Sequence, residues 1–452
     1  MGPVRTRGSG CQLWHVCLAV LLAVSLVGCS AGMPSLPSLS SIKNPFKKKK
    51  EPLPGERVAV ITDQNAEAAD PAAAAKPITL PPPVANASWS EPGGSPANSL
   101  GHLALGDRLN KIWRVDVGTG SSWHGRLSAI PLVADGKVFT LDAGGTVSAF
   151  TASSGSRVWG TSVTPKNEKR AEGFGGGLAL DSGRLYVTTG YGTVVGIDPE
   201  KGTVLWTQKV GEPVRSSPSA AGGKVYFVST DSVLHCLDGN DGQELWTAKG
   251  VPEPATLLSN VSPAIGQGVV VAVFPAGDVT AYGISNGQPS WKESLARTSE
   301  TSAAGILADP ARPVIDHGVV FAVGHGGKMI AVSESTGELL WSRNVTSTQM
   351  PWPAGGVVYV VDETGKLMAL SRADGKVHWL TQLPGTARWN GPVLAGGKLW
   401  LVSTDGSLVG ADARSGQVSS TTALGTKVFV SPVVAGGHMY ILADNATLIA
   451  LN

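Results

Sequence analysis

The chain has 452 residues, a length that fits several small domains or one large all-β domain. Glycine occurs 58 times, about 13% of residues against an average near 7%, while charged residues make up only 15%. A net charge of +2 excludes the basic footprint of a nucleic-acid-binding protein, and 42% hydrophobic residues exclude wholesale disorder. This composition favours many short strands joined by tight glycine turns.

The N-terminal segment predicts export. Two arginines precede an apolar run, Val16–Val27, which suits the core of a signal peptide but is too short to span a bilayer. The run leads into Leu-Val-Gly-Cys at Cys29, which resembles a bacterial lipobox. We therefore expect residues 1–28 to be a signal peptide and Cys29 to be lipidated, with an ordinary secretory signal as the alternative. Because Ser30 rather than aspartate follows, the resemblance implies a lipid anchor at the periplasmic face of the outer membrane.

The next segment, residues 29–85, is rich in proline, alanine and lysine and has no sustained hydrophobic period. Such a chain cannot bury enough apolar surface to order itself, so we expect a disordered tether. The basic run Lys47–Lys50 either contacts anionic lipid or is a solvated stretch of this tether. With Cys29 acylated, Cys236 has no disulfide partner in the mature chain and is expected to be a buried thiol.

The rest of the chain is organised by an internal repeat. In six copies a small residue lies ten positions before a tryptophan and a glycine lies four before it, as in Gly196, Gly202 and Trp206. A seventh copy has Ser420 at the tryptophan position. Seven tryptophans share this frame at spacings of 38 to 50 residues: Trp113, Trp159, Trp206, Trp246, Trp291, Trp341 and Trp379.

Each copy contains short apolar runs separated by glycine turns, which predicts a four-stranded antiparallel β-propeller blade. The C-terminal runs 438–442 and 447–451 lack a tryptophan strand, whereas 109–115 is a tryptophan strand with no preceding copy. The two ends complete one blade, so we expect residues 86–452 to form an all-β, eight-bladed propeller closed by its N- and C-terminal strands.

Within this propeller the seven repeat tryptophans are expected to dock neighbouring blades, because a buried indole covers a large apolar area. The small residue of each copy would leave room on the neighbouring blade for that ring. Five further tryptophans of the mature chain lie outside the frame and receive no role from it: Trp89, Trp123, Trp352, Trp389 and Trp400.

Motifs that carry catalysis or metal binding are not found in the sequence. The eight histidines have no zinc-ligand spacing, and Gly283-Ile284-Ser285-Asn286-Gly287 coincides with a repeat hairpin rather than a nucleophile elbow. We predict no catalytic, cofactor-binding or metal-binding residues, no cofactor and no enzymatic activity.

The unit from Gly196 to Trp206 resembles the repeat of pyrroloquinoline-quinone-type propellers. Together with the lipobox, and with the lead-in Trp89-Ser90-Glu91-Pro92-Gly93-Gly94, it resembles the BamB family, the propeller lipoproteins of the outer-membrane β-barrel assembly (BAM) complex. The resemblance implies a scaffold that binds the POTRA domains of BamA and other subunits of the complex, and assists the folding and insertion of outer-membrane proteins.

The resemblance also points to Leu257, Leu258 and Asp309 as partner-binding positions, with ordinary inter-blade loop residues as the alternative. Two other functions stay open. Quinoprotein dehydrogenases share the repeat, but they carry a vicinal cysteine pair and a calcium site, and the mature chain has only Cys236 besides Cys29. A propeller lipoprotein with another periplasmic partner is the remaining alternative.

Overall fold

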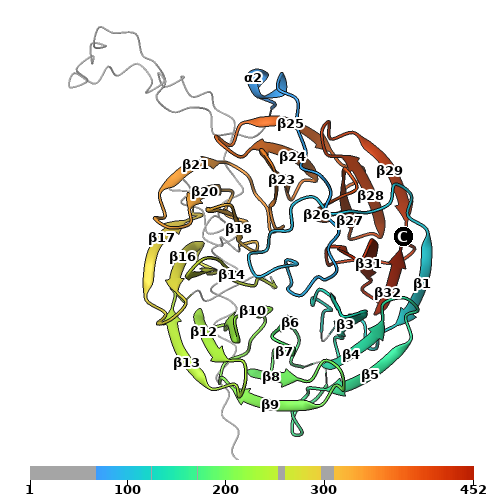
Figure 1. Cartoon of the computed structure of the whole chain (residues 1–452), viewed down its shortest axis with the longest axis vertical. Helices are drawn as coiled ribbons and strands as arrows, with labels where there is room; N and C mark the ends of the chain where they lie inside the picture. Colours follow the sequence, from blue (N-terminus) through green and yellow to red (C-terminus); the bar gives the residue numbers. More distant parts are fainter. Residues whose placement is uncertain (1–67, 124, 171, 253–259, 297–309) are drawn as a thin grey trace, which may run out of the picture. The chain divides into compact units, whose positions relative to one another are not determined.

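The computed structural model describes residues 68–452 except 124, 171, 253–259 and 297–309. Cys29, the predicted signal peptide and residues 29–67 of the expected tether lie outside this part. The strands form eight sheets, each four-stranded and antiparallel, arranged as blades around a common centre (Figure 1). The predicted eight-bladed, all-β propeller is therefore confirmed.

The blades are numbered in chain order, and the strands of each blade are given from the centre of the ring outwards. Blade 1 is β2 (Leu132–Ala134), β3 (Lys137–Leu141), β4 (Thr146–Thr151) and β5 (Arg157–Ser162); blade 2 is β6 (Gly176–Asp181), β7 (Arg184–Thr189), β8 (Thr193–Ile197) and β9 (Val204–Lys209); blade 3 is β10 (Ser219–Ala221), β11 (Lys224–Val228), β12 (Val233–Asp238) and β13 (Glu244–Lys249); blade 4 is β14 (Ala264–Ile265), β15 (Val269–Val273), β16 (Asp278–Gly283) and β17 (Pro289–Ser294). Blade 5 is β18 (Val314–Asp316), β19 (Val319–Val323), β20 (Met329–Ser333) and β21 (Leu339–Arg343); blade 6 is β22 (Trp352–Ala354), β23 (Val357–Val361), β24 (Lys366–Ser371) and β25 (Val377–Gln382); blade 7 is β26 (Trp389–Ala395), β27 (Lys398–Ser403), β28 (Ser407–Asp412) and β29 (Val418–Ala423); blade 8 is β30 (Val433–Ala435), β31 (His438–Leu442), β32 (Thr447–Leu451) and β1 (Lys111–Asp116).

Blade 8 closes the ring with strands from both ends of the propeller. Its outermost strand β1 pairs antiparallel with β32, with Trp113 opposite Ala450. This is the closure expected from the two incomplete repeats. It leaves no blade short of a strand.

Every repeat tryptophan faces the small residue of its own blade, as in the pairs Gly196–Trp206 and Cys236–Trp246. The expectation that the small residue makes a pocket for the neighbouring blade's tryptophan is therefore wrong. In six of these seven blades the physical reason is a second aromatic side chain on the next strand inwards, and blade 4 has Val271 at that position. Tyr186 lies opposite Gly196, and its ring centroid is 6.1 Å from that of Trp206. The small residue lets the two rings meet over it, because a larger side chain would hold them apart.

The tryptophans do reach the neighbouring blade, by a different contact. The indole Nε1 of Trp206 donates to the Gly239 carbonyl of blade 3 at 3.0 Å, and its ring lies against Gly242 in the same hairpin. Equivalent hydrogen bonds to the next blade are donated by Trp113, Trp159, Trp246, Trp291 and Trp341. Trp379 is the exception, since its Nε1 is buried without a partner.

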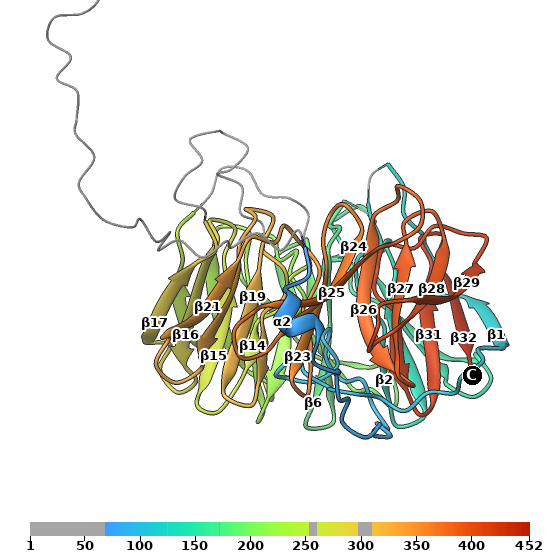
Figure 2. The same cartoon turned by 90° about the horizontal axis from the view of Figure 1, so that it is seen from above.

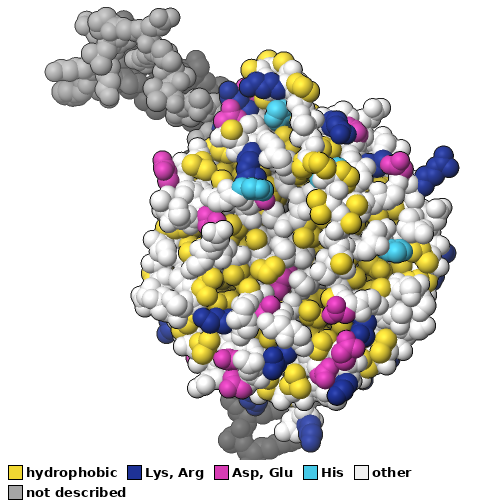
Figure 3. Space-filling model, in the orientation of Figure 1, with side chains coloured by type: hydrophobic (Ala, Val, Ile, Leu, Met, Phe, Trp, Pro, Cys, Tyr) yellow, Lys and Arg dark blue, Asp and Glu magenta, His cyan; other side chains and the backbone are white. Residues whose placement is uncertain are grey.

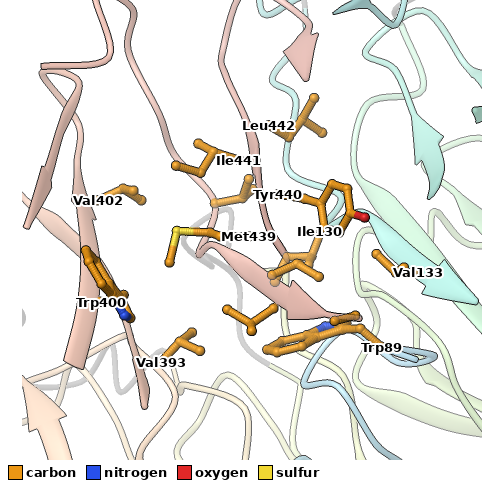
Figure 4. Packing of buried hydrophobic residues seen from close by; sticks show 14 of the residues in the cluster. Trp89, Ile130, Val133, Val393, Trp400, Val402, Met439, Tyr440, Ile441 and Leu442 are labelled. Carbon is orange, nitrogen blue, oxygen red and sulfur yellow. The ribbon is translucent and has the colours of Figure 1, made fainter. Parts of the chain in front are cut away.

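In blade 7, which has Ser420 in place of the repeat tryptophan, a tryptophan on the next strand inwards fills the space over the small residue Gly410. Trp400 on β27 lies opposite Gly410, and a Cβ at Gly410 would sit 2.9 Å from its ring. Figure 4 shows Trp400 beside Val393 and Val402 in the largest hydrophobic cluster, which also contains Trp89 and Met439. Trp400 thereby gains a packing role that its position outside the repeat frame did not reveal.

The N-terminal part of the described chain packs against blade 6. The short helix α2 (Pro71–Ala74) is capped by Asp70, whose backbone N–H donates to the Val377 carbonyl of β25 at 2.9 Å. Ile78 and Leu80 are buried. Part of the segment expected to be tether, residues 70–80, therefore lies against the propeller, because a capped helix and two apolar side chains find partners there.

Candidate functional site

Residues 84–103, called the strap below, run around the centre of the ring on one face. Figures 1 and 2 show this segment against the inner ends of the blades. It makes hydrogen bonds to all eight blades in the order 8, 1, 2, 3, 4, 5, 6 and 7, through Asn86, Trp89, Ser90, Glu91, Pro96, Ala97, Gly101 and Leu103. The face carrying the strap is the strap face; the opposite face, where each outermost strand leads to the next blade, is the loop face.

Two stacked tryptophans join the strap to blade 6. The rings of Trp89 and Trp352 lie 6.1 Å apart between centroids with 25° between their planes, and both side chains are buried. Trp352 Nε1 also donates to the Gly101 carbonyl at 2.7 Å. These two residues, which the repeat left unexplained, hold the strap across the centre of the ring.

A buried carboxyl joins the strap to blade 3. Glu91 is 0% exposed, and its oxygens accept the Ala220 N–H at 3.2 and 3.3 Å. Burial raises the pKa of Glu91 well above its ordinary value; the Ala220 bond opposes the shift, and Asp181 adds to it. A protonated Glu91 therefore fits this position better than a carboxylate does.

A central cavity of about 670 Å³ lies between the strap and the connections of the loop face. Trp89, Pro92 and Trp352 belong to its lining on the strap side. On the loop-face side the lining comes from the segments that lead into the innermost strands of blades 1, 4, 5, 6, 7 and 8, from β26 itself, and from Thr404 in the turn after β27. Its named residues there are Arg126, Leu127, Ser128, Ile130, Asn260, Val261, Arg312, Thr348, Gln349, Met350, Arg388, Asn390, Gly391, Pro392, Val393, Thr404, Phe429, Val430 and Ser431.

Asn260 braces the cavity wall across three blades. Its Oδ1 accepts from the backbone N–H and hydroxyl of Ser217, and its Nδ2 donates to the carbonyls of Gly176 at 2.7 Å and Ser128 at 3.1 Å. The side chain thus holds the inner ends of blades 1, 2 and 3 together.

The predicted partner-binding residues Leu257, Leu258 and Asp309 lie outside the described residues. They belong to the connections from β13 to β14 and from β17 to β18. The connection from β1 to β2 carries Trp123, whose side chain is 97% exposed. A fully exposed tryptophan is a candidate contact for a protein partner, because tryptophan is enriched among the residues that dominate interfaces.

Neither the strap face nor the Cys236 thiol has the features of a reactive centre. Figure 3 shows acidic and basic side chains interspersed over the strap face without a large patch of either sign. Burial raises the pKa of the Cys236 thiol to about 11, so it is protonated at neutral pH. Among the described residues no group of three or more histidine, cysteine, aspartate or glutamate side chains could hold a metal ion. No helix in the described part of the chain is long and apolar enough to cross a membrane.

The closed ring and its tryptophan repeat define the chain as an eight-bladed propeller of the pyrroloquinoline-quinone repeat class. Residues 101–169, 143–381 and 382–452 match the family described as outer membrane protein assembly factor BamB. Because this match covers most of the propeller and more than half of the chain, the chain belongs to that family.

Two curated relatives are similar over part of their length. The chain is 27% identical to BamB of Nitrosomonas eutropha over 189 residues, which is 42% of this chain and 43% of that protein. It is 25% identical to BamB of Yersinia pestis over 204 residues, or 44% of this chain and 51% of that protein. The chain therefore spans about half the length of the curated relatives it matches.

Solved structures share the fold at lower sequence identity. The crystal structure of BamB from Moraxella catarrhalis superposes with a TM-score of 0.66 at 16% identity, covering 76% of this chain and all of that one. A europium-containing methanol dehydrogenase superposes with a TM-score of 0.63 at 14% identity, covering 78% and 89%. Enzymes and assembly factors thus share this architecture, and fold alone does not choose between them.

Proposed function

We propose that this protein is a non-enzymatic scaffold lipoprotein of the BAM complex. In this proposal it binds BamA through the POTRA domains, contacts other subunits, and assists the folding and insertion of outer-membrane proteins. The observation that carries the proposal is membership of the BamB family over residues 101–452. The rigid ring supports it, since connections on one face of a closed propeller can present a fixed surface to a protein partner.

The anchor belongs to the same proposal. Residues 1–28 would be removed, Cys29 would carry the lipid, and the protein would be held at the periplasmic face of the outer membrane. Labelling cells with a palmitate analogue tests this step. Wild type should incorporate the label and sediment with membranes, whereas Cys29→Ser should lose both. Incorporation that survives the substitution would place the acyl chain elsewhere.

Crosslinking pull-down from membranes tests the partner. The tagged protein should capture BamA, and changing Leu257, Leu258 and Asp309 together to alanine should weaken that capture. The control is Leu339→Ala with Leu340→Ala, because these leucines are 44% and 47% exposed on the outer strand of blade 5. Unchanged capture by the triple variant would refute the residue assignment. Absence of BamA from the wild-type capture would refute the scaffold role itself.

An enzyme assay tests the same proposal from the other side. Purified protein is supplied with pyrroloquinoline quinone and calcium, and dye reduction is followed with alcohols and sugars as substrates. We expect no turnover above that of the quinone alone. Sustained reduction that depends on the protein would replace the scaffold role with that of a quinoprotein dehydrogenase.

A further inference from the structure

The central cavity has the size and depth of a small-molecule site. Its volume of about 670 Å³ lies within the range of roughly 300–1,000 Å³ that is common for ligand pockets. The strap contributes Trp89 and Pro92 to one end of the lining, so an occupant meets protein there instead of passing through the ring. A ligand of limited length therefore fits better than an extended chain.

The charged side chains among the described residues of the cavity lining are all basic. Arg126, Arg312 and Arg388 enter it from blades 1, 5 and 7, and no aspartate or glutamate belongs to its described residues. Several neutral polar side chains of the wall already have partners. Gln349 Oε1 accepts the Gly391 N–H at 3.4 Å, and Asn390 Nδ2 donates to the Val428 carbonyl at 3.4 Å. Among the described lining residues, the charged groups left to meet a ligand are thus three guanidinium groups.

Arg312 is the most unusual of the three. Its Nε is buried and has no hydrogen-bond partner, and no ion pair with Arg312 is found in the described part of the chain. Burial lowers the pKa of its guanidinium to about 10, which leaves the group charged at neutral pH. The side chain as a whole is only partly buried, and Arg312 lines the cavity. An anion in the cavity would give this guanidinium a counter-charge that the described residues do not supply.

Two further features favour an anionic occupant. The guanidinium carbon of Arg126 lies 4.6 Å from the ring centroid of Phe429, a contact that fixes the arginine at the cavity wall. The indole Nε1 of Trp89, another lining residue, is also buried without an acceptor. The two lining groups that are buried without a partner, Arg312 Nε–H and Trp89 Nε1–H, are both hydrogen-bond donors.

We propose that the central cavity is a binding site for a small ligand that carries two or more anionic oxyacid groups, carboxylate or phosphate. Guanidinium groups recognise both with paired, charge-assisted hydrogen bonds. The Arg312 guanidinium, the least exposed of the three, meets one anionic group, while Arg126 and Arg388 meet the others. The site is independent of the BAM role and of any redox chemistry.

Calorimetric titration of the purified protein tests the site with citrate and with inorganic phosphate as probes. Wild type should bind at least one of them saturably, and the tighter probe identifies the oxyacid. Arg312→Met should weaken binding at least tenfold. The same substitution should not lower the melting temperature, because Arg312 has no hydrogen-bond or ion-pair partner among the described residues. A purely structural arginine would instead lower the melting temperature when it is removed.

A second cavity variant and a control variant keep the test decisive if Arg312→Met fails to fold. The double change Arg126→Gln with Arg388→Gln alters two exposed side chains and should weaken binding with little effect on melting. Arg114→Gln removes an equal charge from the exposed outer strand of blade 8 and should bind as wild type does. The assignment is overturned if neither probe binds saturably, if the cavity variants bind like Arg114→Gln, or if only a peptide with a free C-terminal carboxylate binds.

Discussion

Substituting the buried strap carboxyl, Glu91→Gln, should change how the stability of the propeller depends on pH. The folded state raises the pKa of Glu91, so it keeps a proton that the unfolded chain releases near its ordinary pKa of about 4.3. Wild-type stability is therefore fully present below about pH 4.3 and falls as the pH rises towards the folded-state pKa. Over that interval one proton separates the two states, which gives a slope of about 1.4 kcal/mol per pH unit.

Glutamine removes this dependence while its side-chain oxygen can still accept the Ala220 N–H. Urea unfolding followed by circular dichroism, at half-unit steps of pH, measures the free energy of unfolding for both proteins. The difference between Glu91→Gln and wild type should grow in favour of the variant as the pH rises. Glu338→Gln, an exposed carboxyl of blade 5, should follow wild type. Parallel curves for Glu91→Gln and wild type would refute the reasoning, since they would mean that Glu91 titrates normally in the fold.

Three further predictions distinguish the contributions of hydrogen bonding, packing and partner binding. Trp206→Phe should lower the free energy of unfolding by about 1 kcal/mol more than Trp379→Phe does, because the Trp206 N–H donates to the next blade while the Trp379 N–H has no partner to lose. Chemical unfolding measures both values, and equal losses would contradict this prediction. Gly242→Ala should destabilise more than Gly223→Ala by thermal unfolding, since both have positive φ but only Gly242 would place its Cβ 2.5 Å from a Trp206 ring atom; similar melting temperatures would contradict it. Trp123→Ala should reduce BamA capture by several-fold without shifting the melting temperature, and unchanged capture would remove this residue from the interface.

The fold could be predicted because the repeat fixes residues at constant offsets. The tryptophan and small positions of each copy sit on neighbouring strands, so their ten-residue spacing reports a hairpin register directly. A third position was available but not used. The aromatic residue opposite the small one also lies ten positions earlier, as Tyr226 does before Cys236 and Tyr440 before Ala450. That position indicates that the small residue lies between two aromatic residues of one blade, whose rings meet over it.

The strap and the cavity could not be predicted in the same way. Asn86 bonds to blade 8 across 348 positions and Asn98 to blade 5 across 215, with no periodic signal between them. Glu91 and Arg312 look in sequence like ordinary loop charges, since charged side chains are usually solvated. Only the three-dimensional path of the strap reveals that one is buried under the ring and that the other lines its centre.

The strap also changes the interpretation of ring closure. Pairing of β1 with β32 completes blade 8 from the two ends of the propeller, so by itself it closes the ring at one place. The strap adds a second, independent closure, because a single segment is bonded to every blade in turn. Opening the ring at any blade boundary must then break strap contacts as well as blade contacts. A ring held in this way keeps its loop face rigid, and a rigid loop face is what both a protein partner and an anion in the central cavity would need.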